Sequence, residues 1–238
     1  MEKLKIRANV TKVESEKTTN LKGLASITIG GIKIDNVRIN NRGGYIFVDL
    51  PQKKEEINGE VVYKDIISFG NGKDKEYSKK LKNAVLNTVL KAYEKEGKVT
   101  SEERETDFDF DSTKVQSYVR NVDSEKIKGV ATLYYGNVIA IKPIFLKEIE
   151  NKETKEKNLI LNFLQYKDKN GEYKDIVYPI EKGLRKKFLD VCIEEYEKNI
   201  EKETRSDNFS IEESDFYKEL EESEKNNAKY EELDEGEI

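Results

Sequence analysis

Histidine and tryptophan are absent from this 238-residue chain, and cysteine and methionine occur once each. Without an imidazole there is no His-activated serine or cysteine nucleophile. A zinc site of the Cys/His kind is excluded as well, because Cys192 alone cannot supply the remaining ligands. We therefore expect a protein that is not an enzyme and that holds no cofactor and no metal. A single cysteine also excludes an internal disulfide, which favours a reducing compartment.

Long apolar runs are missing too. No stretch approaches the roughly 18 apolar residues that a membrane-spanning helix requires. The start, MEKLKIRANV, lacks the apolar core of a signal peptide. The sequence thus predicts a soluble, cytoplasmic protein without a membrane partner.

Charge is unevenly distributed, although the formal net charge is only -5. Basic residues outnumber acidic ones in 1–96 and 112–199, whereas acidic residues dominate 97–111 and 200–238. This division predicts two folded units, a solvated acidic connector and an acidic tail that is disordered or forms a short amphipathic segment. With its many carboxylates, the tail could compete with nucleic acid for a basic surface of the same chain, or it could dock on a basic partner.

Three segments recur in the same order, as in an internal repeat. Residues 21–34 (LKGLASITIGGIKI) align with 127–140 (IKGVATLYYGNVIA), 63–69 (YKDIISF) with 173–180 (YKDIVYPI), and 90–96 (LKAYEKE) with 193–199 (IEEYEKN). Collinear matches predict a tandem duplication. We place the first repeat at 1–96 and the second at 112–199, with the connector at 97–111 between them and the tail at 200–238 after them.

Each repeat has the pattern of several strands followed by one helix. In 21–29, small and aliphatic residues alternate with polar ones, which is the period of a half-buried strand. Gly30-Gly31 and, at the matching place, Gly136-Asn137 predict tight hairpin turns. A change of phase near Asp35-Asn36 predicts a bulge.

Apolar stripes at helical spacing predict helices over 78–96 and from Leu184 to Tyr196, with Cys192 as a buried member of the second stripe. A sheet covered by a single helix leaves apolar surface and an open edge. We therefore predict an α+β molecule in which each repeat is an antiparallel twisted sheet followed by a C-terminal helix, and in which the repeats pack as an intramolecular pseudo-dimer. Further self-association stays open.

Four short motifs carry a resemblance. The first repeat has them at Ala25–Thr28, Phe47–Pro51, Tyr63–Ile66 and Tyr93–Glu94, and the second, more loosely, at Ala131–Leu133, Asn162–Gln165, Tyr173–Ile176 and Tyr196–Glu197. In this pattern the chain resembles the SpoVG septation-regulator family (stage V sporulation protein G) over most of 4–96 and 114–199. The resemblance implies a small dimeric α+β fold and a nucleic-acid-binding regulator of septation and gene expression in bacteria. Family members are single-copy, so a fused pair suggests a specialised relative, bacterial or phage encoded.

The basic loop of that family corresponds here to Lys53 and Lys54. The predicted nucleic-acid-binding residues are Lys53, Lys54, Lys64, Lys79, Lys80 and Lys91 in the first repeat, and Lys167, Lys169, Lys174, Arg185, Lys186 and Lys187 in the second. If these residues lie on one surface, they would contact phosphates without reading the bases. The alternative is that they form an ordinary solvated surface. Acidic residues late in the second helix suggest that the first repeat is the better binder.

We expect the ligand to be DNA in preference to RNA, bound with little sequence specificity. The alternative is a protein-binding module or inhibitor, for example phage or mobile-element encoded, that uses the fold, its sheet edges and the acidic tail to occupy a protein partner. Two other motifs predict no binding site: the first is interpreted as a loop and the second as an acidic linker. Gly70–Lys73 lacks the full phosphate-loop pattern, and the alternating aspartates of 107–111 lack the glycine and glutamate of a calcium loop.

Overall fold

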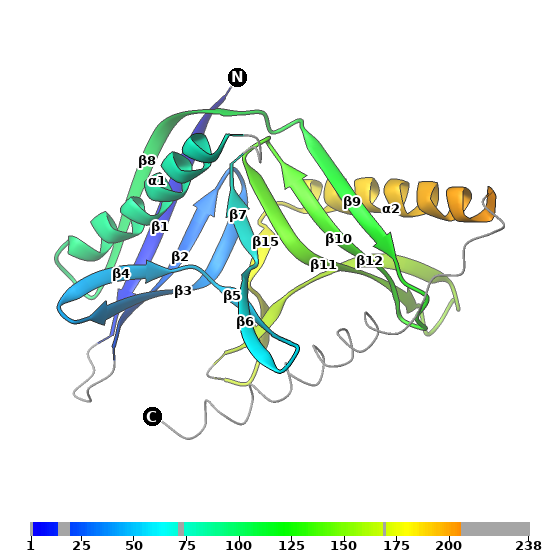
Figure 1. Cartoon of the computed structure of the whole chain (residues 1–238), viewed down its shortest axis with the longest axis horizontal. Coiled ribbons are helices and arrows are strands. Elements are labelled where there is room, and N and C mark those ends of the chain that lie inside the picture. The colour runs from blue at the N-terminus through cyan, green and yellow to red at the C-terminus, as the bar shows by residue number, and fades with distance from the viewer. Residues whose placement is uncertain (1, 14–19, 71–73, 169, 206–238) are drawn as a thin grey trace.

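The computed structural model describes residues 2–13, 20–70, 74–168 and 170–205, and within them the chain forms two curled antiparallel sheets, two hairpins and two helices (Figure 1). The first sheet contains β1 (Glu2–Lys12), β2 (Leu21–Ile29), β3 (Ile32–Arg42), β4 (Tyr45–Asp49), β8 (Val99–Phe110) and β15 (Val177–Pro179). The second sheet contains β7 (Ile67–Phe69), β9 (Val115–Asn121), β10 (Ile127–Tyr135), β11 (Ile139–Glu150) and β12 (Lys157–Phe163). The hairpins are β5 (Gln52–Ile57) with β6 (Glu60–Asp65), and β13 (Gln165–Lys167) with β14 (Tyr173–Asp175). Helix α1 (Lys75–Glu94) packs on the first sheet and α2 (Lys182–Arg205) on the second.

The local patterns of the sequence are found in the structure where they were predicted. The alternation in 21–29 places Ala25, Ile27 and Ile29 in the core. Positive φ angles at Gly30 and Gly31 (55° and 83°) and at Gly136 and Asn137 (both 62°) confirm the two tight turns. The predicted bulge is confirmed as well, because the β2–β3 register shifts opposite Asp35-Asn36. Local residue chemistry was therefore sufficient for these elements.

The two halves of the chain exchange a strand. We call the residues before β8 the first half and those after it the second half. β7 leaves the first half and pairs with β11, so that Ile67 lies opposite Ile141. β15 leaves the second half and pairs with β3 in the same way, with Val177 opposite Ile34. Neither sheet is complete without a strand from the other half.

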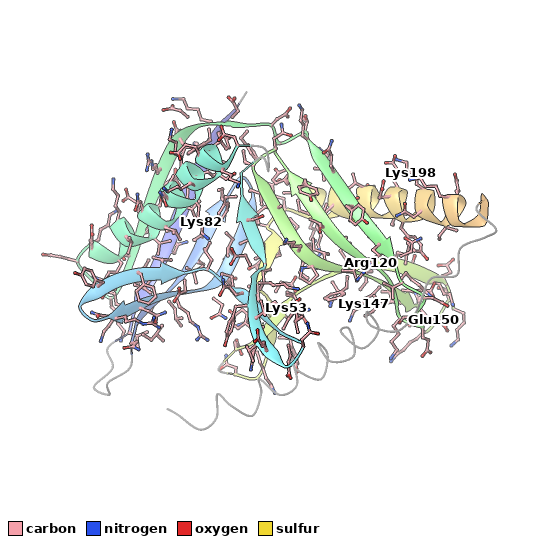
Figure 2. The ribbon with its side chains drawn as sticks, in the orientation of Figure 1. Lys53, Lys82, Arg120, Lys147, Glu150 and Lys198 are labelled. Carbon is pink, nitrogen blue, oxygen red and sulfur yellow. The ribbon has the colours of Figure 1, made fainter. Side chains whose placement is uncertain are left out.

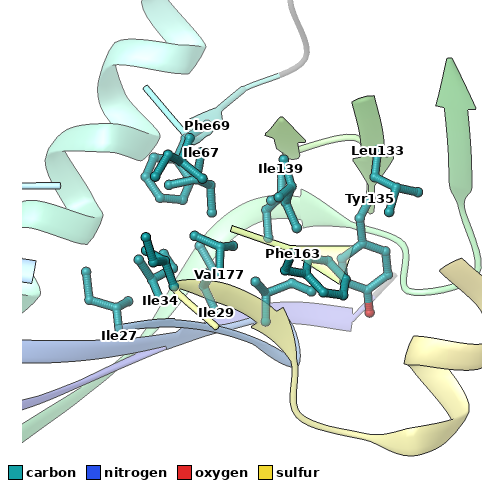
Figure 3. Close-up of a cluster of buried hydrophobic side chains, with 14 of the residues drawn as sticks. Ile27, Ile29, Ile34, Ile67, Phe69, Leu133, Tyr135, Ile139, Phe163 and Val177 are labelled. Carbon is teal, nitrogen blue, oxygen red and sulfur yellow. The ribbon is translucent and has the colours of Figure 1, made fainter. Parts of the chain in front are cut away.

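The exchanged strands unite the core. Buried side chains from both sheets belong to one continuous hydrophobic cluster. In the close-up, Ile67 and Phe69 of the first half and Val177 of the second lie among residues of both sheets, such as Ile34 and Ile139 (Figure 3). Separating the halves would expose this cluster to water, and apolar burial is the main favourable term in folding.

The conformation of residues 99–110 differs from the prediction. The segment that we expected to be a solvated connector forms β8, which pairs with β1 along the edge of the first sheet. Its buried threonines are fastened by hydrogen bonds. Thr100 Oγ1 donates to the Ala92 carbonyl (2.5 Å), and Thr106 Oγ1 donates to the Leu4 carbonyl (3.0 Å). Acidic side chains can point to solvent from an edge strand while its backbone pairs with the neighbouring strand. An excess of acidic residues was therefore not sufficient evidence for a linker.

The end of β8 is held by a single aromatic ring. Phe110 is 4% exposed and meets Tyr135 edge-on at 5.3 Å. A Cβ atom added to Gly30 would come within 2.6 Å of the Phe110 ring, and one added to Gly136 would also collide with it. The ring therefore occupies space between the two matching hairpin turns, one from each half.

The helices also depart slightly from the predicted bounds. α1 begins earlier than predicted, at Lys75, because the Asp74 carboxylate accepts hydrogen bonds from the amides of Glu76 (2.9 Å) and Tyr77 (3.0 Å). α2 extends to Arg205, into the segment assigned to the tail. The rest of the predicted disordered tail, 206–238, lies outside the described residues. In the part of the chain that the structure describes, neither helix is long and apolar enough to cross a membrane.

Cys192 is fully buried in α2, as its place in the apolar stripe predicted. Burial raises the pKa of its thiol to about 12, and a hydrogen bond with Ser117 only partly opposes this. A thiol with that pKa carries almost no thiolate at neutral pH. Cys192 is therefore a packing residue.

Candidate nucleic-acid interface

Two of the predicted lysines meet across the hairpin β5–β6. Lys53 and Lys64 lie directly opposite each other, and both form ion pairs with Glu55, at 3.2 Å in the case of Lys53. Burial would raise the pKa of Glu55, but these two ammonium groups lower it below its usual value. Lys54 lies on the other face of the hairpin, opposite Tyr63.

The hairpin β5–β6 lies over the second sheet. Lys53 and Lys64 line a cavity of about 270 Å³ together with Lys142 and Phe145 of β11. The two lysines thus belong to an interface between the first half and the sheet of the second half. This cross-half contact could not be read from the sequence.

The lysines of α1 lie elsewhere. Lys79, Lys80 and Lys91 are exposed on the side of the helix away from buried Leu81 and Val85. None of the three lines the cavity that holds Lys53 and Lys64. The structure therefore separates the first-repeat lysines into a helix surface and a hairpin surface.

Lys174 and Lys167 of the second half are engaged within their own hairpin. Lys174 forms ion pairs with Asp168 and, at 3.7 Å, with Glu172. Lys167 lies 5.9 Å from the centre of the Tyr173 ring. The hydrogen bond from Lys174, followed by those from backbone amides, lowers the pKa of Asp168 to about 2. Lys169 lies outside the described residues.

The basic cluster at the start of α2 has structural partners. Lys187 Nζ donates to the Thr113 carbonyl (2.7 Å), which ties the helix to the segment before β9. Lys186 pairs with Asp190 at 3.5 Å. Arg185 pairs with Asp175 at 3.4 Å. These contacts explain why cations are tolerated at a helix N-terminus, where the macrodipole disfavours them.

Each hairpin is fastened to the helix of its own half by one glutamine, one aspartate and one cation. The two sets are Gln52, Asp65 and Lys82, and Gln165, Asp175 and Arg185. The glutamine Nε2 to aspartate Oδ1 distances are 2.6 and 2.8 Å, and the cation to aspartate distances are 3.7 and 3.4 Å. Because the two sets have the same geometry, we infer that Arg185, like Lys82, holds the hairpin of its half against the helix.

A second basic surface, which was not predicted from the sequence, lies on the outer face of the second sheet. Ser117 Oγ donates to the Val191 carbonyl of α2 (2.9 Å), so odd-numbered residues of β9 face the helix and even-numbered ones face away. Tyr118 on β9 and Tyr134 on β10 are 62% and 49% exposed. We call this surface the tyrosine face. Its residues are Gln116, Tyr118, Arg120, Lys128, Val130, Thr132, Tyr134, Lys142, Phe145 and Lys147.

The charge of the tyrosine face is positive. β9 and β10, both fully within the described residues, contain no acidic residue. Arg120 and Lys147 are both on this sheet (Figure 2), and Lys142 is exposed on β11. A signal existed in the sequence, since the segments 115–121 and 127–135 combine cations and tyrosines without a carboxylate, but only the register joins them into one surface.

The corresponding face of the first sheet is balanced by acid. Lys3, Lys5 and Arg7 alternate on the exposed side of β1, and β8 lies beside them. The register places Asp109, Glu105 and Glu103 opposite these three cations in that order. Lys5 and Glu105 form an ion pair at 3.4 Å. The acidic strand β8 therefore neutralises one sheet face, whereas the sequences of β9 and β10 contribute no carboxylate to the tyrosine face.

Two curled antiparallel sheets with one helix on each define an α+β protein, and within its described residues no group of three or more His, Cys, Asp or Glu side chains is placed to hold a metal ion. Residues 111–198 match the model of the SpoVG family, so the second half of the chain contains a SpoVG domain. The match includes β9 to β15 and lies on the half whose motifs we found looser. Comparison with curated proteins gave no match, and comparison with solved structures gave none.

Proposed function

We propose that the protein is a non-enzymatic regulator that binds nucleic acid, and that it consists of two SpoVG-like repeats joined as an intramolecular pseudo-dimer. The reciprocal strand exchange supports the second part. Besides the paired strands, the Lys142 amide donates to the Ile66 carbonyl (2.9 Å), and the Asp35 amide donates to the Ile176 carbonyl (2.7 Å). Equivalent backbone bonds in both directions are what a two-fold arrangement of two like units requires.

The tyrosine face is the observation that supports nucleic-acid binding. It combines cations with exposed aromatic rings, whereas on the first sheet the cations of β1 lie opposite acidic residues of β8. Lysine and arginine that neutralise phosphates supply most of the affinity of sequence-independent binding. Aromatic side chains on a sheet add a surface on which any base can stack. Both features occur in the second half, so we assign binding there and not, as the sequence suggested, mainly to the first repeat.

The binding assignment is tested with two variants that remove the same charge from different surfaces. The first variant changes Arg120, Lys142 and Lys147 to glutamine, and the second changes Lys79, Lys80 and Lys91. Affinity for a mixed-sequence DNA is measured by mobility shift at 50 and 200 mM salt. Three phosphate contacts correspond to a salt slope of about 2.7, hence roughly a forty-fold loss of affinity over that range.

We expect the first variant to lose most of this affinity and salt dependence, and the second to stay close to the parent protein. Equal losses would place the interface on both surfaces and contradict our assignment. Absence of binding at either salt would overturn the proposed function and favour the alternative, a module that occupies a protein partner.

A further inference from the structure

The tyrosine face combines two exposed rings at a fixed spacing. Tyr118 pairs with Thr132 and Tyr134 with Gln116, so the tyrosines are diagonal neighbours on adjacent strands. Diagonal residues of an antiparallel pair lie about 7–8 Å apart. Both tyrosines are carried by strands of the sheet, so the separation of their backbone positions changes little when a ligand binds.

From this spacing, and on the basis of the proposed function, we infer that the tyrosine face binds single-stranded nucleic acid, with separate bases stacked on Tyr118 and Tyr134. Consecutive bases in a duplex strand are about 3.4 Å apart along the axis. Two tyrosines on strand positions roughly twice that distance apart can each stack on a base only if the bases are splayed apart. A duplex must break stacking and pairing to do this, at a cost of a few kcal/mol, whereas a single strand is already free to unstack.

Charge complementarity supports the same ligand. Arg120 is two residues from Tyr118 on the same strand, and Lys142 lies on the far side of β10, so cations flank the tyrosines across the sheet. The carboxylates that line the nearby cavity are engaged elsewhere: Glu55 with Lys53 and Lys64, and Asp65 with Gln52 and Lys82. A strand of phosphates that crosses β9, β10 and β11 would therefore meet Arg120 on β9 and then Lys142 on β11, which lies in the cavity beside the hairpin β5–β6.

The ligand class is tested by fluorescence anisotropy on the full chain at 50 mM salt. The probes are a labelled 15-nucleotide single-stranded DNA of mixed sequence and the duplex of the same sequence. The variants are Tyr118→Ala and Tyr134→Ala, with Tyr118→Phe as the conservative variant. Tyr45→Ala is the matched control, because Tyr45 is 81% exposed on β4 of the first half.

We expect the single strand to bind more tightly than the duplex. Each alanine variant of the face should weaken single-strand binding roughly 5- to 150-fold, the range for one lost stacking contact. Tyr118→Phe should keep the affinity, since its ring still stacks, and Tyr45→Ala should leave it unchanged. Thermal unfolding of every variant verifies that the fold is retained.

The possible failures are distinguishable. Equal or tighter binding of the duplex, or alanine variants of the face that bind as the parent does, would overturn the single-strand inference and leave nucleic-acid binding in place. Failure of the parent protein to bind either probe would overturn the proposed function itself.

Discussion

Substitution of Gly136 by alanine measures how firmly the Phe110 ring is held between the two hairpin turns. Gly136 has a φ of 62°, and an added Cβ would collide with that ring. Gly43 is a matched control, because its φ is 60° and an added Cβ would meet no atom within 4 Å. Both substitutions impose the same left-handed strain, and only one of them also imposes the collision.

The two substitutions should differ by the energy of the collision. A left-handed alanine costs about 1–2 kcal/mol, and reduced freedom of the unfolded chain returns about 0.4–1 kcal/mol. Gly43→Ala should therefore destabilise by about 1 kcal/mol. Crowding in a packed core adds about 1–3 kcal/mol, so Gly136→Ala should cost about 2–4 kcal/mol. Phe110→Ala should cost about 3–5 kcal/mol.

A double-mutant cycle then isolates the contact. In the Phe110→Ala background the ring is gone, so adding Gly136→Ala should cost no more than Gly43→Ala does. The free energy of unfolding is measured by urea denaturation followed by circular dichroism. The reasoning is refuted if Gly136→Ala and Gly43→Ala agree within about 0.5 kcal/mol, or if the two effects at Gly136 and Phe110 are simply additive.

Two further predictions concern titrating groups. Burial raises the pKa of Cys192 from 9.0 to about 12, so at pH 8 a thiol reagent should label the native protein at least about a thousandfold more slowly than the urea-unfolded chain; comparable rates would contradict a packing role. The pKa of Asp168 is lowered from 3.8 to about 2, chiefly by the hydrogen bond from Lys174. Its ionised form therefore stabilises the fold above about pH 4, and this contribution is lost as the pH falls through about 2. Thermal unfolding between pH 2 and 5 should show a weaker pH dependence for Asp168→Asn than for the parent, and identical profiles would refute the contact.

The acidic segment 97–111 was predicted wrongly from the sequence, since most of it forms a strand. Its alternating Asp and Phe residues have the period of a strand, yet the excess of carboxylates indicated a solvated linker. The segment forms a strand because Phe110 and two threonines bury one side while the acids face solvent beside the cations of β1. Pairing with a distant strand decided the outcome, and local propensity does not encode that pairing.

The amino-acid pattern was sufficient to predict the elements whose signals are local. These include the alternation of β2, the glycine turns, the bulge at Asp35-Asn36, the apolar faces of both helices and the burial of Cys192, because each depends on the spacing of neighbouring residues.

Which half completes each sheet, and which side chains share a surface, depends on the packing of the whole chain. Strands β7 and β15 are three residues long, too short to specify a partner on their own. Tyr118 and Tyr134 are 16 positions apart and become neighbours only through the β9–β10 register. Side chains far apart along the chain form one surface only when strand pairing brings them together, and that pairing depends on burial across the whole molecule.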